Sequence, residues 1–328
     1  MSTWVRAALL VLGLFILAGF VVSLDLAANV SAVSGADAGW LALALALLVA
    51  NVLVKALRWR VMAATMSQRP LSLPAASAAI LAGVAAASLT PGRGVELAKP
   101  LLLRSSHGVP MTASTAAVVV ERLLDGAALI ILFAVSLLVV PAGRGSAFYP
   151  VIAAIGLFLA AGAALLLLPH RLTSLATWVT DRLPFPARVR SRVASIAERF
   201  AGGLAVWRRG GNFGLLLAMS VTAACVEVLR LTAVFAALRL HISVAAAMLA
   251  FCAANLLGAA TFIPGGIGIT EFSLAGIITL VTALGPRSAV AAAVLVDRVL
   301  SYYLVVALGS LILVAASRRT PSSGQEGR

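Results

Sequence analysis

Long apolar runs, separated by short polar connections, fill most of this chain. Six of them are long enough for a helix to cross the roughly 30 Å hydrocarbon core of a bilayer. They occupy positions 7–24, 40–64, 112–140, 149–168, 213–238 and 287–315. The pattern therefore predicts an all-α polytopic membrane protein with about six full spans.

Two further apolar stretches, 75–104 and 243–284, are interrupted by proline and glycine. Backbone that leaves the helix inside a membrane is tolerated only against protein or a wet cavity. Because proline ends a helix and glycine accepts positive φ, we expect each stretch to be a broken helical hairpin, either re-entrant or short and paired. In the second stretch, we expect the next helix to begin at Ile269 or Thr270, with Glu271 in its first turn, where the helix dipole favours a carboxylate. The predicted turn residues are Pro91, Gly92, Gly94, Pro264, Gly265, Gly266 and Gly268.

The two broken hairpins belong to an internal repeat. Blocks of sequence recur in the same order after 172 to 176 positions, a spacing that a chance likeness between alanine-rich spans does not explain. The pairs are VKALRW (54–59) with VEVLRL (226–231), SLTPGRGVELA (88–98) with FIPGGIGITEF (262–272), and VVVERLL (118–124) with AVLVDRVL (293–300). We therefore predict one transmembrane domain over 1–320, with repeats at 40–140 and 213–315, followed by a disordered tail at 321–328.

Arginine is concentrated in the connections on one side of the membrane. The 170–212 connection holds eight arginines, whereas 25–39 holds neither arginine nor lysine. The positive-inside rule then places 170–212 and both termini in the cytoplasm, and we expect a multi-pass protein of the inner cell membrane. Three crossings separate the two hairpins, and since this number is odd, the repeats are predicted to be inverted, as in many transporters. We expect residues 1–32 to be retained as a helix rather than removed as a signal peptide.

Composition narrows the possible functions. Hydrophobic residues make up 62% of the 328 and charged residues only 11%, with a net charge of +14. With no soluble domain to bind nucleic acid, the positive charge is better suited to anionic lipid headgroups. Cys225 and Cys252, together with three distant histidines, offer no metal-ligand spacing, and no P-loop or dinucleotide fingerprint is present. We expect no metal and no cofactor.

Charged side chains inside the apolar segments are the candidate functional residues. Six of the eleven acidic residues lie there, although a charge at the centre of a spanning helix costs about 2.5–3.5 kcal/mol on insertion scales. Such charges need partners, a wet cavity or both. The candidate headgroup-binding residues are Lys55, Arg58, Arg93, Glu96, Lys99, Glu121, Arg122, Asp125, Glu227, Arg230, Glu271, Asp297 and Arg298.

Several charges on the spanning helices have more than one candidate role. Glu227 and Arg230 share a helix face, so they are expected either to pair with each other or to act in function. Lys55 and Arg58 share a helix face and repel each other, so both are expected to be satisfied by Glu121, by Asp125 or by the phosphate of a lipid. The alternative is that Arg58 snorkels to the cytoplasmic interface beside the neighbouring tryptophan.

The broken turns leave similar alternatives open. Glu271 is expected either to cap the start of its own helix or to pair with Arg298 or Arg122. Arg93 and Lys99 flank the first turn and are candidates for holding an anion. A helix start can also hold a phosphate through its N–H groups.

The motifs that carry these charges resemble the transmembrane region of lysylphosphatidylglycerol synthases, which also defines a wider group of flippase-like integral membrane proteins. They are LRWR (57–60), TPGRGVELAKPLLLR (90–104), VVERLLD (119–125), PGGIGITEF (264–272) and VLVDRVLSYYL (294–304). In the synthases, this region is associated with moving the modified lipid between leaflets, and a soluble aminoacyl-transferase domain follows it. The resemblance implies translocation and an enzyme of lipid or glycolipid synthesis as a partner. Since this chain ends in SRRTPSSGQEGR soon after its last span, we expect no synthase activity.

Together, the residues and the resemblance predict a lipid translocase that binds a phospholipid or polyprenyl headgroup between its two broken hairpins. A groove lined by Arg58, Arg93, Lys99, Arg122 and Arg298 would replace the water that the headgroup loses. Without an ATP motif, movement would be downhill or coupled to an ion gradient.

Two other interpretations remain open at this point. The first is an intramembrane transferase or hydrolase that uses Glu96, Glu121 or Asp125 as an acid or base. The second is a non-catalytic membrane partner of a lipid synthase. A vesicle assay separates them, because lipid that changes leaflet unaltered indicates translocation and product formation indicates an enzyme.

The topology is directly testable. In a variant in which Cys225 and Cys252 are replaced, single cysteines in 170–212 should react only with reagents supplied from the cytoplasmic side, because of the arginine bias. Single cysteines in 25–39 should react only from the opposite side. Labelling of both segments from one side would contradict the inverted repeat.

Overall fold

The computed structural model describes the helices that carry most of the candidate residues. It covers residues 34–66, 71–88, 99–100, 111–140, 212–261, 263–282, 284 and 287–319, with isolated positions between 174 and 198. Several predicted features lie outside these residues: the spans 7–24 and 149–168, most of the 170–212 connection, the tail 321–328, and the first broken turn with Pro91, Gly92, Arg93, Gly94 and Glu96.

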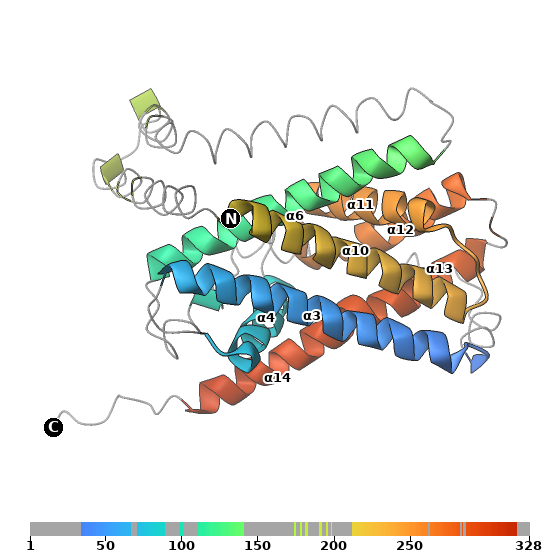
Figure 1. Cartoon of the computed structure of the whole chain (residues 1–328), viewed down its shortest axis with the longest axis horizontal. Helices are drawn as coiled ribbons and strands as arrows, with labels where there is room; N and C mark the ends of the chain where they lie inside the picture. The colour runs from blue at the N-terminus through green and yellow to red at the C-terminus, as the bar shows by residue number, and fades with distance from the viewer. Residues whose placement is uncertain are drawn as a thin grey trace.

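Long apolar helices form the framework (Figure 1). They are α3 (Ala38–Met66), α6 (Met111–Val139), α10 (Phe213–Ala237), and a continuous rod of α13 (Arg287–Arg298), the π-helical turn η3 (Val299–Tyr303) and α14 (Leu304–Arg319). Within the described residues, four stretches are long and apolar enough to cross a membrane: Ala38–Thr65, Ser114–Val139, Phe213–Ala237 and Arg287–Ala316. These match four of the six predicted spans.

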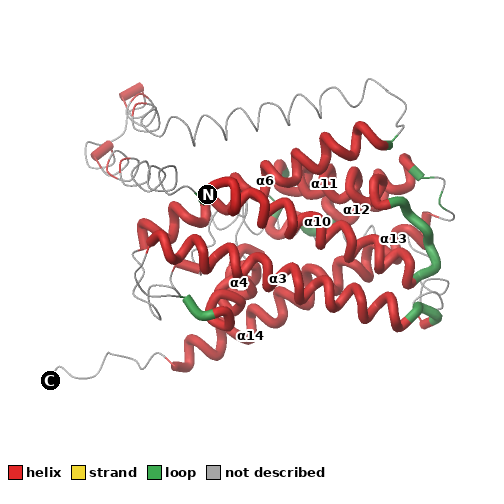
Figure 2. The backbone as a smooth tube through the Cα atoms, in the orientation of Figure 1, coloured by secondary structure: helices red, strands yellow, loops and turns green. Residues whose placement is uncertain are grey.

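Shorter apolar helices fill the spaces between the long ones. They are α4 (Leu73–Ser88), α11 (Val244–Ala260) and α12 (Ile269–Val281). α4 packs along α14 and α3, while α11 packs along α12 and α6. The described part of the chain contains helices and short loops and no strand, which confirms the all-α prediction (Figure 2).

The helices α3 and α10 run side by side in opposite directions (Figure 1). The N–H of Asp37, just before α3, donates to the carbonyl of Ala237 at the end of α10, at 2.9 Å. Further along α3, Arg58 Nη1 donates to Ser220 Oγ, near the start of α10, at 2.5 Å. As the residue numbers rise along one helix they fall along the other, so the two helices are antiparallel.

Corresponding residues of the two repeats touch each other where α3 meets α10. Asn51 Nδ2 donates to the carbonyl of Ala223 at 2.8 Å, and Lys55 Nζ donates to Glu227 Oε1 at 2.5 Å. The partners are 172 positions apart in both pairs, which is the offset between the VKALRW and VEVLRL blocks. Equivalent positions meet in this way where a two-fold axis passes between them.

The second broken hairpin has the predicted turn. A 3₁₀ turn, η2 (Pro264–Gly266), joins α11 to α12, and φ is +65°, +66° and +83° at Gly265, Gly266 and Gly268. These values lie in the left-handed region that glycine adopts without strain, which confirms the reason given for the glycines. Pro264 differs from the prediction, because it begins the 3₁₀ turn, whereas α11 already ends at Ala260. The next helix begins as predicted, with its acidic residue in the first turn.

Glycine also allows α14 to approach α4 closely. A Cβ added at Gly309 would lie 2.1 Å from the carbonyl oxygen of Leu81 and 2.9 Å from Cβ of Ala85. Backbone atoms cannot yield as the end of a flexible side chain can, so the two helices would have to separate. Small residues at such crossings are typical of helix packing in membranes.

We predict that Gly309→Ala destabilises the protein by about 1–3 kcal/mol, because the added methyl group forces α14 away from α4. Gly276→Ala is the matched control, since a Cβ at Gly276 in α12 meets nothing within 4 Å and alanine favours the helix. Thermal unfolding of the purified variants in detergent measures the difference. Equal melting temperatures for the two variants would contradict the close packing.

Candidate functional site

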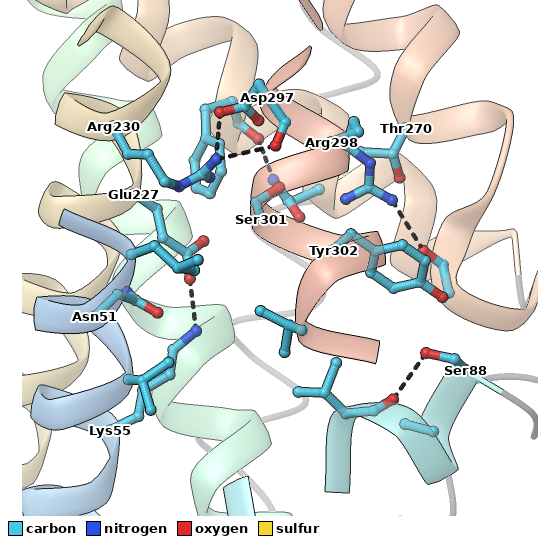
Figure 3. Close-up of a pocket in the computed structure, with 18 of the residues that line it drawn as sticks. Asn51, Lys55, Ser88, Glu227, Arg230, Thr270, Asp297, Arg298, Ser301 and Tyr302 are labelled. Carbon is cyan, nitrogen blue, oxygen red and sulfur yellow. Dashed lines mark hydrogen bonds and ion pairs between the residues drawn. The ribbon is translucent and has the colours of Figure 1, made fainter. Parts of the chain in front are cut away.

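A polar cavity of about 190 Å³ lies between α3, α4, α10, the second hairpin and the rod that contains α13 and η3 (Figure 3). Apolar residues form part of its wall, including Leu48, Ile80, Phe251 and Leu274. This volume is far larger than one water molecule requires. The cavity therefore provides the wet, protein-lined space that charges inside an apolar bundle need.

The described lining residues carry more positive than negative charge. The cations are Lys55, Arg122, Arg230 and Arg298, and the carboxylates are Glu227 and Asp297. Four cations against two carboxylates leave an excess of two positive charges among these residues. All six were candidates from the sequence, and the fold brings them together from α3, α6, α10 and α13.

The ion pair between Lys55 and Glu227 lies at the contact between the repeats. Nζ of Lys55 is 2.5 Å from Oε1 of Glu227, and the side chains are 27% and 25% exposed. Glu227 thus pairs with a different helix and not with Arg230 on its own helix, and the expectation that Lys55 would pair with Glu121 or Asp125 is wrong. Because both side chains are more exposed than those of the other cavity-lining pairs, we expect this pair to cost the least to open.

Two buried ion pairs join the rod to the other helices of the second repeat. Arg230 on α10 pairs with Asp297 on α13. The adjacent Arg298 donates from Nε to Oε1 of Glu271 at 2.7 Å, while Oε2 of Glu271 accepts the N–H of Gly268 at 2.7 Å. The prediction that Glu271 pairs with Arg298 is confirmed. Glu271 also caps its helix, so the two alternatives hold together, one for each carboxylate oxygen.

A second buried cluster centres on Arg58. Nη2 of Arg58 donates to Oε1 of Glu121 at 2.8 Å, and Nη1 pairs with Asp125. Oε2 of Glu121 accepts from Nζ of Lys99 at 2.8 Å. The Arg58 side chain is only 1% exposed, so its predicted alternative as a snorkelling interface residue is wrong. Arg58 and Lys99 also do not line the cavity, contrary to the predicted groove; Arg58 pairs with Glu121 and Asp125 instead, and Lys99 pairs with Glu121.

The ion pairs define a repeat register that differs from the sequence alignment. Arg58 and Asp125 are 67 positions apart, and so are Arg230 and Asp297. The structure therefore makes Asp125 the counterpart of Asp297, whereas the sequence blocks paired Glu121 with Asp297. The difference is one helical turn along one face, and residues four apart on a helix can reach the same partner.

Uncharged polar residues complete the cavity, and sequence analysis did not select them. They are Asn51, Ser88, Asn255, Thr270, Ser301 and Tyr302. The available signal was spacing, since Asn51 lies one turn before Lys55 and Tyr302 one turn after Arg298 on the same helix faces. A search of the apolar segments for polar side chains one helical turn from a charged residue would have identified Asn51 and Tyr302.

We predict that Arg58→Met destabilises the protein by about 3–5 kcal/mol, because Glu121 and Asp125 would lose their shared buried cation. Arg60→Met is the control, since Arg60 is exposed and donates to the carbonyl of Leu71. Fluorescence-detected size-exclusion chromatography after heating would measure the remaining folded fraction. A loss of the same size in both variants would show that the buried cluster does not hold α3 to α6.

Comparison with known proteins agrees with the motifs. The family profile of the lysylphosphatidylglycerol synthase TM region matches residues 7–309, so the chain belongs to this family. A curated relative, a UPF0104 membrane protein from Methanothermobacter thermautotrophicus, is 28% identical over 301 residues, which cover 84% of this chain and 83% of the relative. The resemblance predicted from the motifs is therefore confirmed, and the chain is a membrane protein of this family.

Proposed function

We propose that this member of the lysylphosphatidylglycerol synthase TM region family is a lipid translocase, which moves a phosphate-bearing lipid headgroup between the leaflets of the inner membrane. The observation that carries the proposal is the charged cavity between the repeats, with four cations and two carboxylates inside an apolar bundle. The phospholipid or polyprenyl headgroup would bind in this cavity.

The chemistry of the cavity suits the barrier that a headgroup meets. A bare bilayer blocks headgroup transfer because the polar group would have to leave its water without finding other partners. Arginine and lysine side chains in a protein-lined cavity replace that hydration with charge-assisted hydrogen bonds. The acyl or prenyl chains stay in the surrounding lipid, so the protein has to shield only the headgroup.

An inverted repeat gives this cavity access to both leaflets. In our proposal, repeats 40–140 and 213–315 are related by a two-fold axis near the membrane plane, with both termini in the cytoplasm. The antiparallel course of α3 and α10 and the contact of Asn51 with Ala223 support this arrangement. Rocking of one repeat against the other would then open the cavity alternately to each side.

The pair of Lys55 and Glu227 is the element that exchanges partners during transport. It lies on the proposed axis and is partly hydrated, so a headgroup arriving from either leaflet meets it in the same way. A phosphate can replace Glu227 as the partner of Lys55 while the other cavity-lining pairs stay closed. Movement would follow the lipid gradient or an ion gradient.

An acid–base role is poorly served by two of the three residues that the sequence offered for it, and the third, Glu96, lies outside the described residues. Glu121 and Asp125 are held by Arg58 and Lys99 and do not line the cavity. A general acid or base must reach the reacting group within hydrogen-bond distance. A lipid- or glycolipid-synthesis enzyme remains our proposed partner, which would supply the lipid chemistry that this chain does not perform.

A leaflet-exchange assay tests the proposal. The full chain is reconstituted into vesicles that contain fluorescent phosphatidylglycerol, and a reductant that cannot cross the membrane bleaches the outer leaflet. Wild-type protein should expose inner-leaflet lipid faster than protein-free vesicles do. Lys55→Gln should slow exchange about tenfold, because the phosphate loses a cation and Glu227 is left unpaired. The control is Arg287→Gln, which removes the same charge at an exposed position outside the cavity and should exchange at the wild-type rate.

The lipid recovered from the vesicles decides between the alternatives. Unaltered lipid that has changed leaflet supports translocation. Exchange no faster than in protein-free vesicles contradicts it, and a chemically modified lipid would make the protein an enzyme. Equal slowing by the Lys55 and Arg287 substitutions would show that the cavity charge has no special part in transport.

A further inference from the structure

Two buried hydroxyl groups, on residues that line the cavity, have no hydrogen-bond partner in the described part of the chain. They are Oγ1 of Thr270, whose residue is 1% exposed, and Oη of Tyr302, whose residue is 9% exposed. A buried hydroxyl without a partner destabilises the fold that contains it. Two such hydroxyls on residues that line one cavity are expected where a ligand supplies the missing hydrogen-bond partner.

The backbone beside each hydroxyl carries a glycine, and no other residue would leave room for the hydroxyl there. A Cβ at Gly265 would lie 1.7 Å from Oη of Tyr302, and a Cβ at Gly258 would lie 2.4 Å from Oγ1 of Thr270. Any other residue at Gly265 would also be strained by its φ of +65°. Both hydroxyls therefore lie against the second hairpin, that of Tyr302 at the broken turn and that of Thr270 at Gly258 in α11 (Figure 3).

Arg298 supplies the positive charge beside the hydroxyls. Its guanidinium carbon lies 4.5 Å from the ring centre of Tyr302, and Nη2 donates to the carbonyl of Gly265 at 3.4 Å. A guanidinium has five N–H donors, and among the described residues the acceptors are this carbonyl and Glu271. Both oxygens of Glu271 are themselves occupied, by Arg298 and by the N–H of Gly268. Glu271 thus orients Arg298 and leaves other N–H groups of the guanidinium for a ligand.

The start of α12 adds to the same preference. Thr270 is in the first turn of this 13-residue helix, where backbone N–H groups have no partner within the helix and the dipole is positive. Hydroxyl, guanidinium and helix start all act as donors, and all favour an acceptor with negative charge. The hydroxyl oxygens can also accept, but an ammonium group would be repelled by the guanidinium and by the positive helix start, and an uncharged sugar would not use the positive field.

We propose that Thr270, Tyr302 and Arg298 form a subsite for one tetrahedral oxyanion, the phosphate of a ligand in the cavity. This inference rests on the proposed function where it assigns the phosphate to the headgroup of the transported lipid. It places the resting position of the phosphate at the second hairpin, whereas Lys55, across the cavity, pairs with the phosphate only as the headgroup enters or leaves (Figure 3).

Conservative substitutions test the subsite on the full-length protein in an uncharged, phosphate-free detergent. Titration calorimetry would measure binding of inorganic phosphate, of dioctanoyl phosphatidylglycerol and of phosphate-free dioctanoylglycerol. Thr270→Val and Tyr302→Phe each remove one hydroxyl and should weaken binding of the phosphate-bearing ligands about tenfold. The melting temperature without ligand should stay the same or rise, because neither hydroxyl has a partner to lose.

Two controls remove hydroxyls that lie outside the cavity. Thr279→Val removes a hydroxyl of α12 that donates to the carbonyl of Ala275. Tyr303→Phe removes a buried hydroxyl that also lacks a described partner but does not line the cavity. Both controls should bind phosphatidylglycerol as the wild type does. Unchanged binding in the Thr270 and Tyr302 variants, or equal loss in test and control variants, would overturn the subsite.

Comparing the ligands shows whether the bound phosphate belongs to a lipid headgroup or is free phosphate. Together with the exchange assay, it also distinguishes failure of the subsite from failure of the proposed function. Tighter binding of phosphatidylglycerol than of inorganic phosphate, with competition between them, supports a lipid headgroup. Binding of inorganic phosphate alone, weakened by the same variants, overturns the lipid assignment. If the protein does not exchange lipid, but the Thr270 and Tyr302 variants still weaken phosphate binding, translocation is overturned and the subsite stands. If exchange is normal, but these variants bind phosphate as the wild type does, the subsite is overturned and translocation stands.

Discussion

The need to neutralise charge inside an apolar bundle is the constraint on which this structure depends. Each long helix of the described residues carries charged side chains at depths where water is scarce, and an unpaired charge there is costly. The ion pairs satisfy this need by connecting helices that are distant in sequence, as when Arg58 on α3 reaches Glu121 and Asp125 on α6. Helix packing and charge pairing therefore determine one another.

The proposed two-fold relation between the repeats places a further demand on these charges. Residues that are equivalent in the two repeats meet at the axis, so identical charges at that point would repel. The sequence has Lys55 in one repeat and Glu227 in the other, and the contact becomes an ion pair. Away from the proposed axis, both repeats have an arginine paired with an aspartate. Arg58 pairs with Asp125 in one repeat, and Arg230 pairs with Asp297 in the other.

The cavity is lined both by charged side chains that are paired and by two hydroxyl groups that have no described partner. Glu271 holds both the turn and Arg298, which makes the second hairpin rigid where it borders the cavity. The π-helical turn η3 begins directly after Arg298 and contains Tyr302, whose hydroxyl lies against the broken turn. Wide π-helical turns inside α-helices are frequent at functional sites, and here the turn faces the polar space.

The sequence alone determined the class, four of the span positions, the broken turn at Gly265 to Gly268 and the membrane charges, because these depend on local composition and on backbone preferences. It also offered Arg298 as one of two partners for Glu271, the other being Arg122. Only the tertiary structure decided that Arg58 and Lys99 belong to a buried cluster while Lys55 and Arg230 line the cavity. On a helix, positions three or four apart share a face, so spacing cannot tell which of several carboxylates a given cation meets. That choice depends on how neighbouring helices are rotated and packed, which long-range contacts determine.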